Sequence, residues 1–202
     1  MRPTEILSAE HRVIEQVLDC VEKIAEGAER RGALDAEAAT ASIRFLKTFA
    51  DRCHHGKEEG QLFPAIGERG IPTRVGPVAV MLDEHELGRR EIAAMESAVQ
   101  SVRGNDPKAL GLYVAHARAY VELLREHILK EDNILFPMAE AALSDEDRAR
   151  VLAAFEKVES EDLGHGMHED MLVVADWLAE RFGVEKASAR VPAAFHGCCH
   201  KH

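Results

Sequence analysis

The chain has 202 residues and a formal net charge of -11, with 46% hydrophobic but only 5% aromatic residues. This acidic balance argues against nucleic acid and anionic membrane surfaces as partners, because both carry negative charge themselves. No apolar run reaches the roughly 18 residues of a spanning helix, and residues 1–5 lack a signal-peptide core, so we expect a cytoplasmic protein.

The composition predicts an all-α protein. Ala, Leu, Glu and Arg dominate, and all four favour helices. Runs of β-branched residues with a period of two are absent, which argues against sheets. The length is sufficient for one domain with a sizeable hydrophobic core.

The first half of the chain predicts two helices. Apolar residues from Ile6 to Ile24 recur at helical spacing, and Gly32 is expected to end this helix. Asp35 is a plausible N-cap for the second helix. We expect Pro64 to break that helix, because proline cannot continue a regular helix.

The second half predicts two more helices and an extension. Pro77 suits the first turn of a third helix, and a fourth follows Pro107 and ends at Pro137. Ser144 opens a fifth helix, and an amphipathic segment covers 167–182. We therefore expect a single domain over 1–182. It consists of a bundle at 4–140 and a helical extension at 144–182, followed by a flexible tail at 183–202.

Two stretches in the predicted second and fourth helices repeat each other. The segments 54–64 and 127–137 share His, Lys, Glu, Leu, Phe and Pro at six of eleven positions. Both contain His-x-x-x-Glu, and residues four apart lie on one face of an α-helix. A single such pair is more typical of a solvated surface contact, but its repetition indicates a metal pair.

The repeat extends to the first and third predicted helices, which carry Glu10-His11 and Glu84-His85. Each half thus supplies one histidine and then His-x-x-x-Glu, which predicts a four-helix bundle with pseudo-twofold symmetry. Burying these groups without a cation would be costly, whereas imidazole and carboxylate ligands suit iron, and also manganese or zinc. The candidate metal ligands are His11, His54, Glu58, His85, His127 and Glu131.

A count of ligands indicates what the centre could bind. If Glu58 and Glu131 both bridge, each metal receives two histidines and two carboxylate oxygens. A bridging oxide or hydroxide adds a fifth ligand and leaves one position on each metal for a small molecule. The Glu-x-x-His signature of ferritin-like bundles is absent, which argues against iron storage.

These six residues, with both Leu-Phe-Pro segments, resemble the hemerythrin-like (HHE cation-binding) domain over about residues 5–140. The resemblance implies an up-down-up-down four-helix bundle around two iron ions, oxo- or hydroxo-bridged. It places the bridging roles on Glu58 and Glu131, and the terminal roles on the four histidines. Oxygen, nitric oxide or peroxide would be the small oxidant, with an electron-donor protein as a further partner.

The chain departs from the oxygen-carrying hemerythrins at two positions. Arg89 stands where those proteins have a fifth histidine, and Glu131 replaces an aspartate that lies five residues after its histidine. We therefore expect reaction with peroxide or nitric oxide rather than reversible oxygen carriage. The ligand set is also similar to that of iron–sulfur cluster repair proteins, although these usually carry an N-terminal cysteine-bearing domain, which is not seen here. A metal- or gas-sensing module without catalysis is the alternative.

Several neighbouring residues leave alternatives open. His55 could shift the second-helix pair to His55-x-x-x-Glu59, but alignment of the two Leu-Phe-Pro segments favours His54. Tyr120 lies two turns before His127, where it either packs in the core or reaches the site as a donor or ligand. His168 lies either in a surface loop or in a lid whose imidazole approaches an open metal position.

Overall fold

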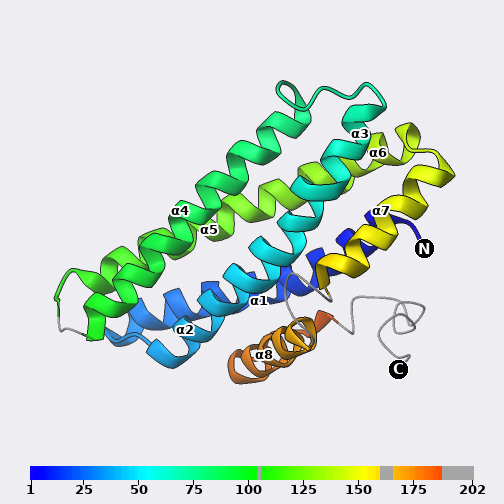
Figure 1. Cartoon of the computed structure of the whole chain (residues 1–202). Helices are drawn as coiled ribbons and strands as arrows, with labels where there is room; N and C mark the ends of the chain where they lie inside the picture. Colours follow the sequence, from blue (N-terminus) through cyan, green and yellow to red (C-terminus); the bar gives the residue numbers. More distant parts are fainter. Residues whose placement is uncertain (104–105, 160–165, 188–202) are drawn as a thin grey trace.

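The computed structural model describes residues 1–103, 106–159 and 166–187. Four long helical runs alternate in direction and pack side by side, as Figure 1 shows. They are α1 (Pro3–Arg31), a run over 36–68, α4 (Pro77–Arg103) and a run over 109–142. The predicted all-α, up-down-up-down bundle with additional C-terminal helices is confirmed.

The helix ends lie where local sequence signals place them. Gly32 follows α1 with a φ of 66°, a left-handed conformation that glycine adopts without steric cost. The Asp35 carboxylate accepts a hydrogen bond of 3.1 Å from the Ala38 N–H at the start of the second run. Pro77 is the first residue of α4, where its missing N–H has no helical partner to lose.

Replacing Asp35 with alanine is expected to lower the free energy of unfolding by about 1 kcal/mol, because the Ala38 N–H loses its acceptor. Asp35 also pairs with Arg181, whose Nε lies 3.0 Å from Oδ2. Asp35→Asn is the matched control, since it keeps a capping oxygen and removes the charge. Urea unfolding of the metal-free protein measures both variants. An equal loss in the asparagine variant would assign the effect to the ion pair.

Proline does not break the second and fourth runs, which corrects the expectation at Pro64 and Pro137. Each run widens into π-helix just before its Leu-Phe-Pro segment, and Pro64 and Pro137 then lie in the first turn of the α-helix that follows. The Phe63 N–H reaches the Glu58 carbonyl five residues back. Such wider turns accommodate a residue that lacks an N–H, so the helix continues. The second run comprises α2 (Ala36–Phe45), η1 (Leu46–His55), η2 (Glu58–Leu62) and α3 (Phe63–Glu68), and the fourth comprises α5 (Ala109–Lys130), η3 (Glu131–Leu135) and α6 (Phe136–Ala142).

The bundle has two apolar cores with a polar layer between them. The larger core extends along α1, α2, α4 and α5 and includes Ile24, Phe45 and Tyr113. The smaller core lies at the other end of the bundle and includes Leu7 and Phe155. Hydrophobic burial on both sides therefore holds the four helices in register around the buried polar groups between the cores.

Two further helices pack on the outside of the bundle. α7 (Asp145–Lys157) begins at the Ser144 capping box and adds Phe155 to the smaller core, while α8 (Met167–Phe182) lies against α1 and α2. The Ala187 N–H donates to Gln16 Oε1 at 2.5 Å, so the first residues of the predicted tail contact α1. Residues 188–202 lie outside the described part.

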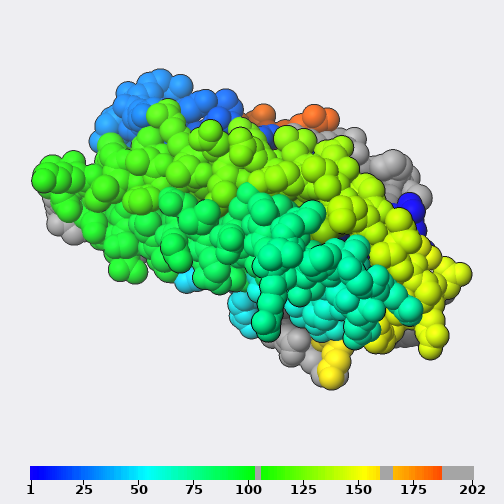
Figure 2. Space-filling view, turned by 90° about the horizontal axis from the view of Figure 1, so that it is seen from above, coloured from blue at the N-terminus to red at the C-terminus, as the bar shows by residue number. Residues whose placement is uncertain are grey.

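The face seen from above is covered mainly by α4 and the run over 109–142, which lie side by side in Figure 2. None of the helices in the described ranges combines the length and apolar character needed to cross a membrane.

Candidate metal centre

The six residues expected to bind metal come together between the two apolar cores. Each is at most 1% exposed, although four separate helical runs supply them. Their burial follows from their positions, because each lies on the inward face of its helix midway along the bundle. The residues are His11, His54, Glu58, His85, His127 and Glu131.

The first candidate metal position is formed by His11, His54, Glu58 and Glu131. One nitrogen or oxygen from each lies within 4.8 Å of the others. His11 Nε2 is 3.2 Å from Glu131 Oε2, and His54 Nε2 is 3.6 Å from Glu58 Oε1. Ligands at about 2.1 Å on opposite sides of one ion lie roughly 4.2 Å apart, so small side-chain movements would suffice for coordination.

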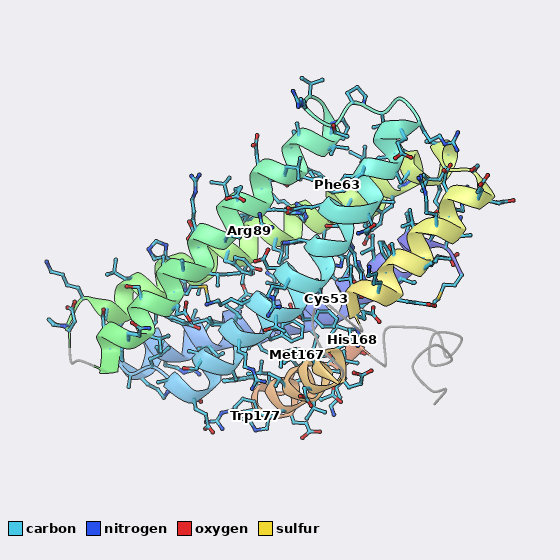
Figure 3. All side chains as sticks on the ribbon, viewed as in Figure 1. Cys53, Phe63, Arg89, Met167, His168 and Trp177 are labelled. Atoms are coloured by element: carbon cyan, nitrogen blue, oxygen red, sulfur yellow. The ribbon has the colours of Figure 1, made fainter. Side chains whose placement is uncertain are left out.

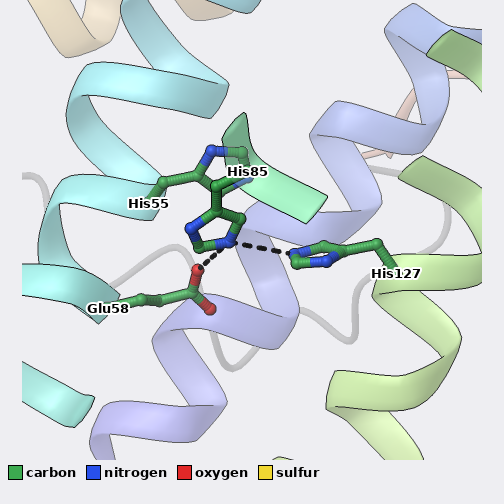
Figure 4. Close-up of side chains that lie close together, drawn as sticks. All are labelled: His55, Glu58, His85 and His127. Atoms are coloured by element: carbon green, nitrogen blue, oxygen red, sulfur yellow. Dashed lines mark hydrogen bonds and ion pairs between the residues drawn. The ribbon is translucent and has the colours of Figure 1, made fainter. Parts of the chain in front are cut away.

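The second candidate position is formed by His55, Glu58, His85 and His127 (Figure 4), again within 4.8 Å of one another. His85 Nε2 lies 3.5 Å from Glu58 Oε2 and 3.2 Å from His127 Nε2. Glu58 belongs to both positions. Glu131 Oε2 is 3.2 Å from both His11 Nε2 and His127 Nε2, so it also lies between the two.

His55 lies in the bundle interior together with His54, although alignment of the two Leu-Phe-Pro segments favours His54 alone. Both residues belong to the π-helix η1, which spans ten residues. Over that length the larger number of residues per turn changes which side chains face inward, compared with an α-helix. His55 is 4% exposed, and its ring stacks on His85 with a centroid distance of 3.8 Å. The site thus contains five histidines instead of four.

A carboxylate holds the outer nitrogen of each of the other four histidines. Each pair joins two different helical runs, and each turns the histidine Nε2 toward the centre. A hydrogen-bonded Nδ1–H leaves the Nε2 lone pair available to a metal, an arrangement common among metal-binding histidines. The Nδ1 partners are Asp132 for His11 (2.9 Å), Glu10 for His54 (2.9 Å), Glu59 for His85 (2.6 Å) and Glu84 for His127 (3.0 Å).

A basic side chain in turn binds each of these four carboxylates. The result is a layered centre in which inward imidazoles, carboxylates and cations follow one another outward. In three of the pairs the cation binds the carboxylate oxygen that does not hold the histidine. In the fourth, Arg89 and His85 share one oxygen of Glu59. The pairs are Lys57 with Glu10, Lys130 with Glu84, Arg12 with Asp132 (2.5 Å) and Arg89 with Glu59 (2.6 Å).

Several buried polar atoms at the centre have no hydrogen-bond partner among the described residues. Buried polar atoms in native proteins are nearly always satisfied, and an unsatisfied carboxylate oxygen is especially costly. A cation between these atoms would remove that cost, so the residues present fit a metal site. The atoms are His54 Nε2, both ring nitrogens of His55, both carboxylate oxygens of Glu58, and Glu131 Oε1.

The electrostatics of the centre also suit a cation. Burial, and then the charge of Glu131, raise the pKa of Glu58 well above its usual range. Burial lowers the pKa of His54 to about 4 and that of His55 well below its ordinary value. These two imidazoles are therefore neutral at pH 7, the form that binds metals. Despite burial, neighbouring carboxylates raise the pKa of His11 and raise that of His127 to about 9, so these two would lose a proton when a metal binds.

Comparison with known proteins decides the family. Residues 2–139 match the hemerythrin HHE cation-binding domain, which is more than half of the chain. The chain belongs to the hemerythrin HHE cation-binding family. The match ends at Ala139, before α7 and α8, so the C-terminal extension lies outside the family's domain.

Two groups of curated relatives are similar to this hemerythrin HHE protein. Uncharacterized proteins of Mycobacterium bovis and Mycobacterium tuberculosis are 23% identical over 192 residues, covering 94% of this chain and 73% of each relative. The iron-sulfur cluster repair protein YtfE of Salmonella newport is 34% identical over 89 residues, covering 43% of this chain and 40% of the relative. No solved structure gives a significant match.

The Leu-Phe-Pro segments of this hemerythrin HHE protein cover the centre. Phe63 stacks on His85 with a centroid distance of 6.1 Å, and Phe136 stacks on His11 at 5.3 Å. The same pairing thus occurs in both halves, across different helices. The two rings belong to the smaller apolar core, so they shield the polar layer from water at that end of the bundle.

The remaining sequence alternatives are resolved as follows. Tyr120 packs in the larger core, and its hydroxyl donates to no residue in the described part of the chain. His168 lies on α8 (Figure 3), where its Nε2 is 4.0 Å from Glu10 Oε1. It therefore approaches a carboxylate around the centre and not the metal positions themselves. Its neighbour His165 lies outside the described residues.

The sequence itself contains a signal for the outer carboxylates and lysines. Glu10 and Glu84 immediately precede His11 and His85, and an acidic residue follows each His-x-x-x-Glu. The lysine is one of the six positions shared by the two repeated stretches. Repetition of these charged residues beside the ligands in both halves is the feature that could have identified them.

Proposed function

We propose that this protein holds two iron ions between its four helical runs and binds a small oxidant there: oxygen, nitric oxide or peroxide. The observation that carries the proposal is the convergence of five imidazoles and two carboxylates in one buried layer, where several inward atoms have no hydrogen-bond partner among the described residues. Family membership supports a metal cation at this place. Imidazole with carboxylate is a ligand combination that suits iron.

The ligands divide unequally between the two ions. His11 and His54 would hold one ion, and His55, His85 and His127 the other, with Glu58 and Glu131 shared. The two-histidine half therefore has one ligand fewer, and we expect the small molecule to bind on that side. When bound, the iron pair would supply Lewis acidity and electrons for reduction of an oxidant. The stacked Phe63 and Phe136 rings would keep bulk water away.

His55 changes the expectation about oxygen. One of the two departures from the oxygen-carrying hemerythrins is Arg89 in place of a fifth histidine, and the other is Glu131. His55 would supply a fifth imidazole from another helix, which removes the first departure and leaves the second. Arg89 instead donates to Glu59, the carboxylate that holds His85. Oxygen binding and peroxide consumption are therefore both to be measured.

A second candidate is the repair of damaged iron–sulfur clusters. The similarity to YtfE favours it, because that relative is named for this activity and matches 43% of the chain. Either activity would change the oxidation state of the ions, so an electron-donor protein is a proposed partner. Recovery of activity in a nitric-oxide-damaged iron–sulfur enzyme, with and without the iron-loaded protein, distinguishes repair from simple binding of the oxidant.

The direct test of the proposed function is metal analysis and the visible spectrum of protein purified without oxygen. About two iron ions per chain are expected. The reduced protein is then mixed separately with oxygen, nitric oxide and peroxide, and uptake or consumption of each is followed. Protein that retains no iron, or loaded protein whose spectrum responds to none of the three, would contradict the proposal.

A further inference from the structure

Lys57 and Lys130 occupy the same place in the two repeats but have different surroundings. Each directly precedes a shared carboxylate, and each binds the glutamate that holds a histidine of the same repeat. The Lys57 side chain is 0% exposed, whereas that of Lys130 is 35% exposed. The difference arises from the C-terminal extension, which covers the first repeat.

The extension contributes two residues to the surroundings of Lys57. Glu159, just after α7, binds its ammonium group directly. The Phe155 ring lies with its centroid 5.7 Å from Lys57 Nζ. A fully buried ammonium group needs such compensation, because its desolvation is costly. Within the described ranges, Glu84 is the acidic partner of Lys130, and α7 and α8 supply none.

Glu10, Glu159 and His168 could be considered a third metal position, because one atom of each lies within 4.8 Å of the others. However, the ammonium group of Lys57 already binds both carboxylates. The Lys57 ammonium group therefore already supplies the positive charge that a metal ion would supply at this position. The cluster is better explained as support for the metal centre than as another ion site.

The contacts form a continuous chain from the surface of the extension to the centre. Glu159 is 34% exposed and binds Lys57, which binds Glu10 Oε1. Glu10 Oε2 accepts the Nδ1–H of His54 at 2.9 Å. Because both oxygens of Glu10 are held, the carboxylate has one orientation, and His54 directs Nε2 toward the centre.

We propose that Glu159 is a positioning residue of the metal centre, which acts through Lys57 and Glu10 on His54. The C-terminal extension would then stabilise metal binding in the His11–His54 half and not in the His85–His127 half. This inference rests on the proposed function in one respect, namely that both halves bind an ion.

The test is the rate of iron(II) release from the loaded protein to a chromophoric chelator, measured without oxygen. Loss of a residue that orients a metal-binding histidine typically lowers metal affinity 10–100-fold. Glu159 acts two contacts further out than Glu10, so Glu159→Gln is expected to accelerate the release of one of the two iron equivalents by a smaller factor, up to about tenfold. Release of the other equivalent is expected to remain unchanged.

Two reference variants assign the released equivalents to their halves. Glu10→Gln should accelerate the same equivalent as Glu159→Gln, and Glu84→Gln should accelerate the other. Glu146→Gln is the matched control, since Glu146 is an exposed residue of α7 and the charge change is identical. In the metal-free protein, the downfield imidazole N–H signal of His54 should shift in Glu159→Gln and remain in place in Glu146→Gln.

Equal acceleration of both equivalents, or of neither, would overturn the inference, and so would an effect of the same size in Glu146→Gln. A wild-type protein that binds no iron would instead overturn the proposed function, and the selective role of Glu159 with it. Two bound equivalents with uniform release in Glu159→Gln would contradict the inference alone.

Discussion

Replacing Glu58 with alanine is expected to remove iron from both halves of the centre. Glu58 belongs to both ligand groups, and Glu131 lies between His11 and His127, so Glu131→Ala should have the same effect. A metal that binds only the folded state adds about 2.7 kcal/mol of stability at 100 times its dissociation constant, and about 4.1 kcal/mol at 1,000 times. Both variants should lose this contribution, so their Tm should be lower than that of wild-type protein when all three are purified with iron.

Without metal, the order of stability of the wild type and Glu58→Ala should reverse. Both carboxylate oxygens of Glu58 are buried without hydrogen-bond partners in the described structure, so the side chain destabilises the fold when no cation is present. Metal-free Glu58→Ala should therefore be at least as stable as the metal-free wild type. Glu122→Ala, at an exposed glutamate of α5, serves as the control for loss of one acidic side chain. Unchanged iron content in Glu58→Ala and Glu131→Ala would show that neither carboxylate is shared between two ions.

Several helix ends could be predicted because short-range signals determine them. Gly32, Asp35, Pro77 and Ser144 each satisfy or release backbone groups within a few residues, whatever the tertiary context. Convergence of the ligands was also predictable. If the two helices that carry His-x-x-x-Glu belong to one bundle, both copies of the motif can face its interior. The structure brings the six candidate ligands together in this way.

His55 and the continuation of the helix through Pro64 could not be predicted for one shared reason. Both lie at π-helical turns, whereas the prediction used the spacing of an α-helix. Over the ten residues of η1, the larger number of residues per turn changes which side chains face inward. The wider turns form only when the packed bundle stabilises them, so adjacent residues alone gave no signal for them.

The role of the C-terminal extension was likewise inaccessible from the sequence. Glu159 lies 102 positions after Lys57 in the chain, and nothing in its local pattern distinguishes it from the neighbouring glutamates. Its contact with Lys57 depends on how α7 packs against the smaller core through Phe155. Such a contact between a repeated element and a segment outside the repeat becomes visible only in three dimensions.

Replacing His55 with isoleucine is expected to make the two halves of the centre alike. Ile128 is the residue at the corresponding position of the second repeat and is 1% exposed, so isoleucine is compatible with burial in this layer. The variant leaves two histidines in each half. Loss of a direct ligand should accelerate iron release from the His85–His127 half by more than the 10–100-fold that is typical when an outer partner is lost.

The same substitution tests what the fifth histidine does for reactivity. Removing His55 frees a coordination position in the half that otherwise has three imidazoles, so both ions could then bind small molecules. We expect peroxide consumption to rise relative to reversible oxygen uptake, measured with a peroxide assay and an oxygen electrode on iron-reconstituted protein. His116→Ile is the control, because His116 is a partly exposed residue of α5 that pairs with Glu91 at 2.8 Å, away from the centre. If His55→Ile retains two irons with wild-type release rates and wild-type reactivity, His55 is not a ligand, and the difference between the halves must have another cause.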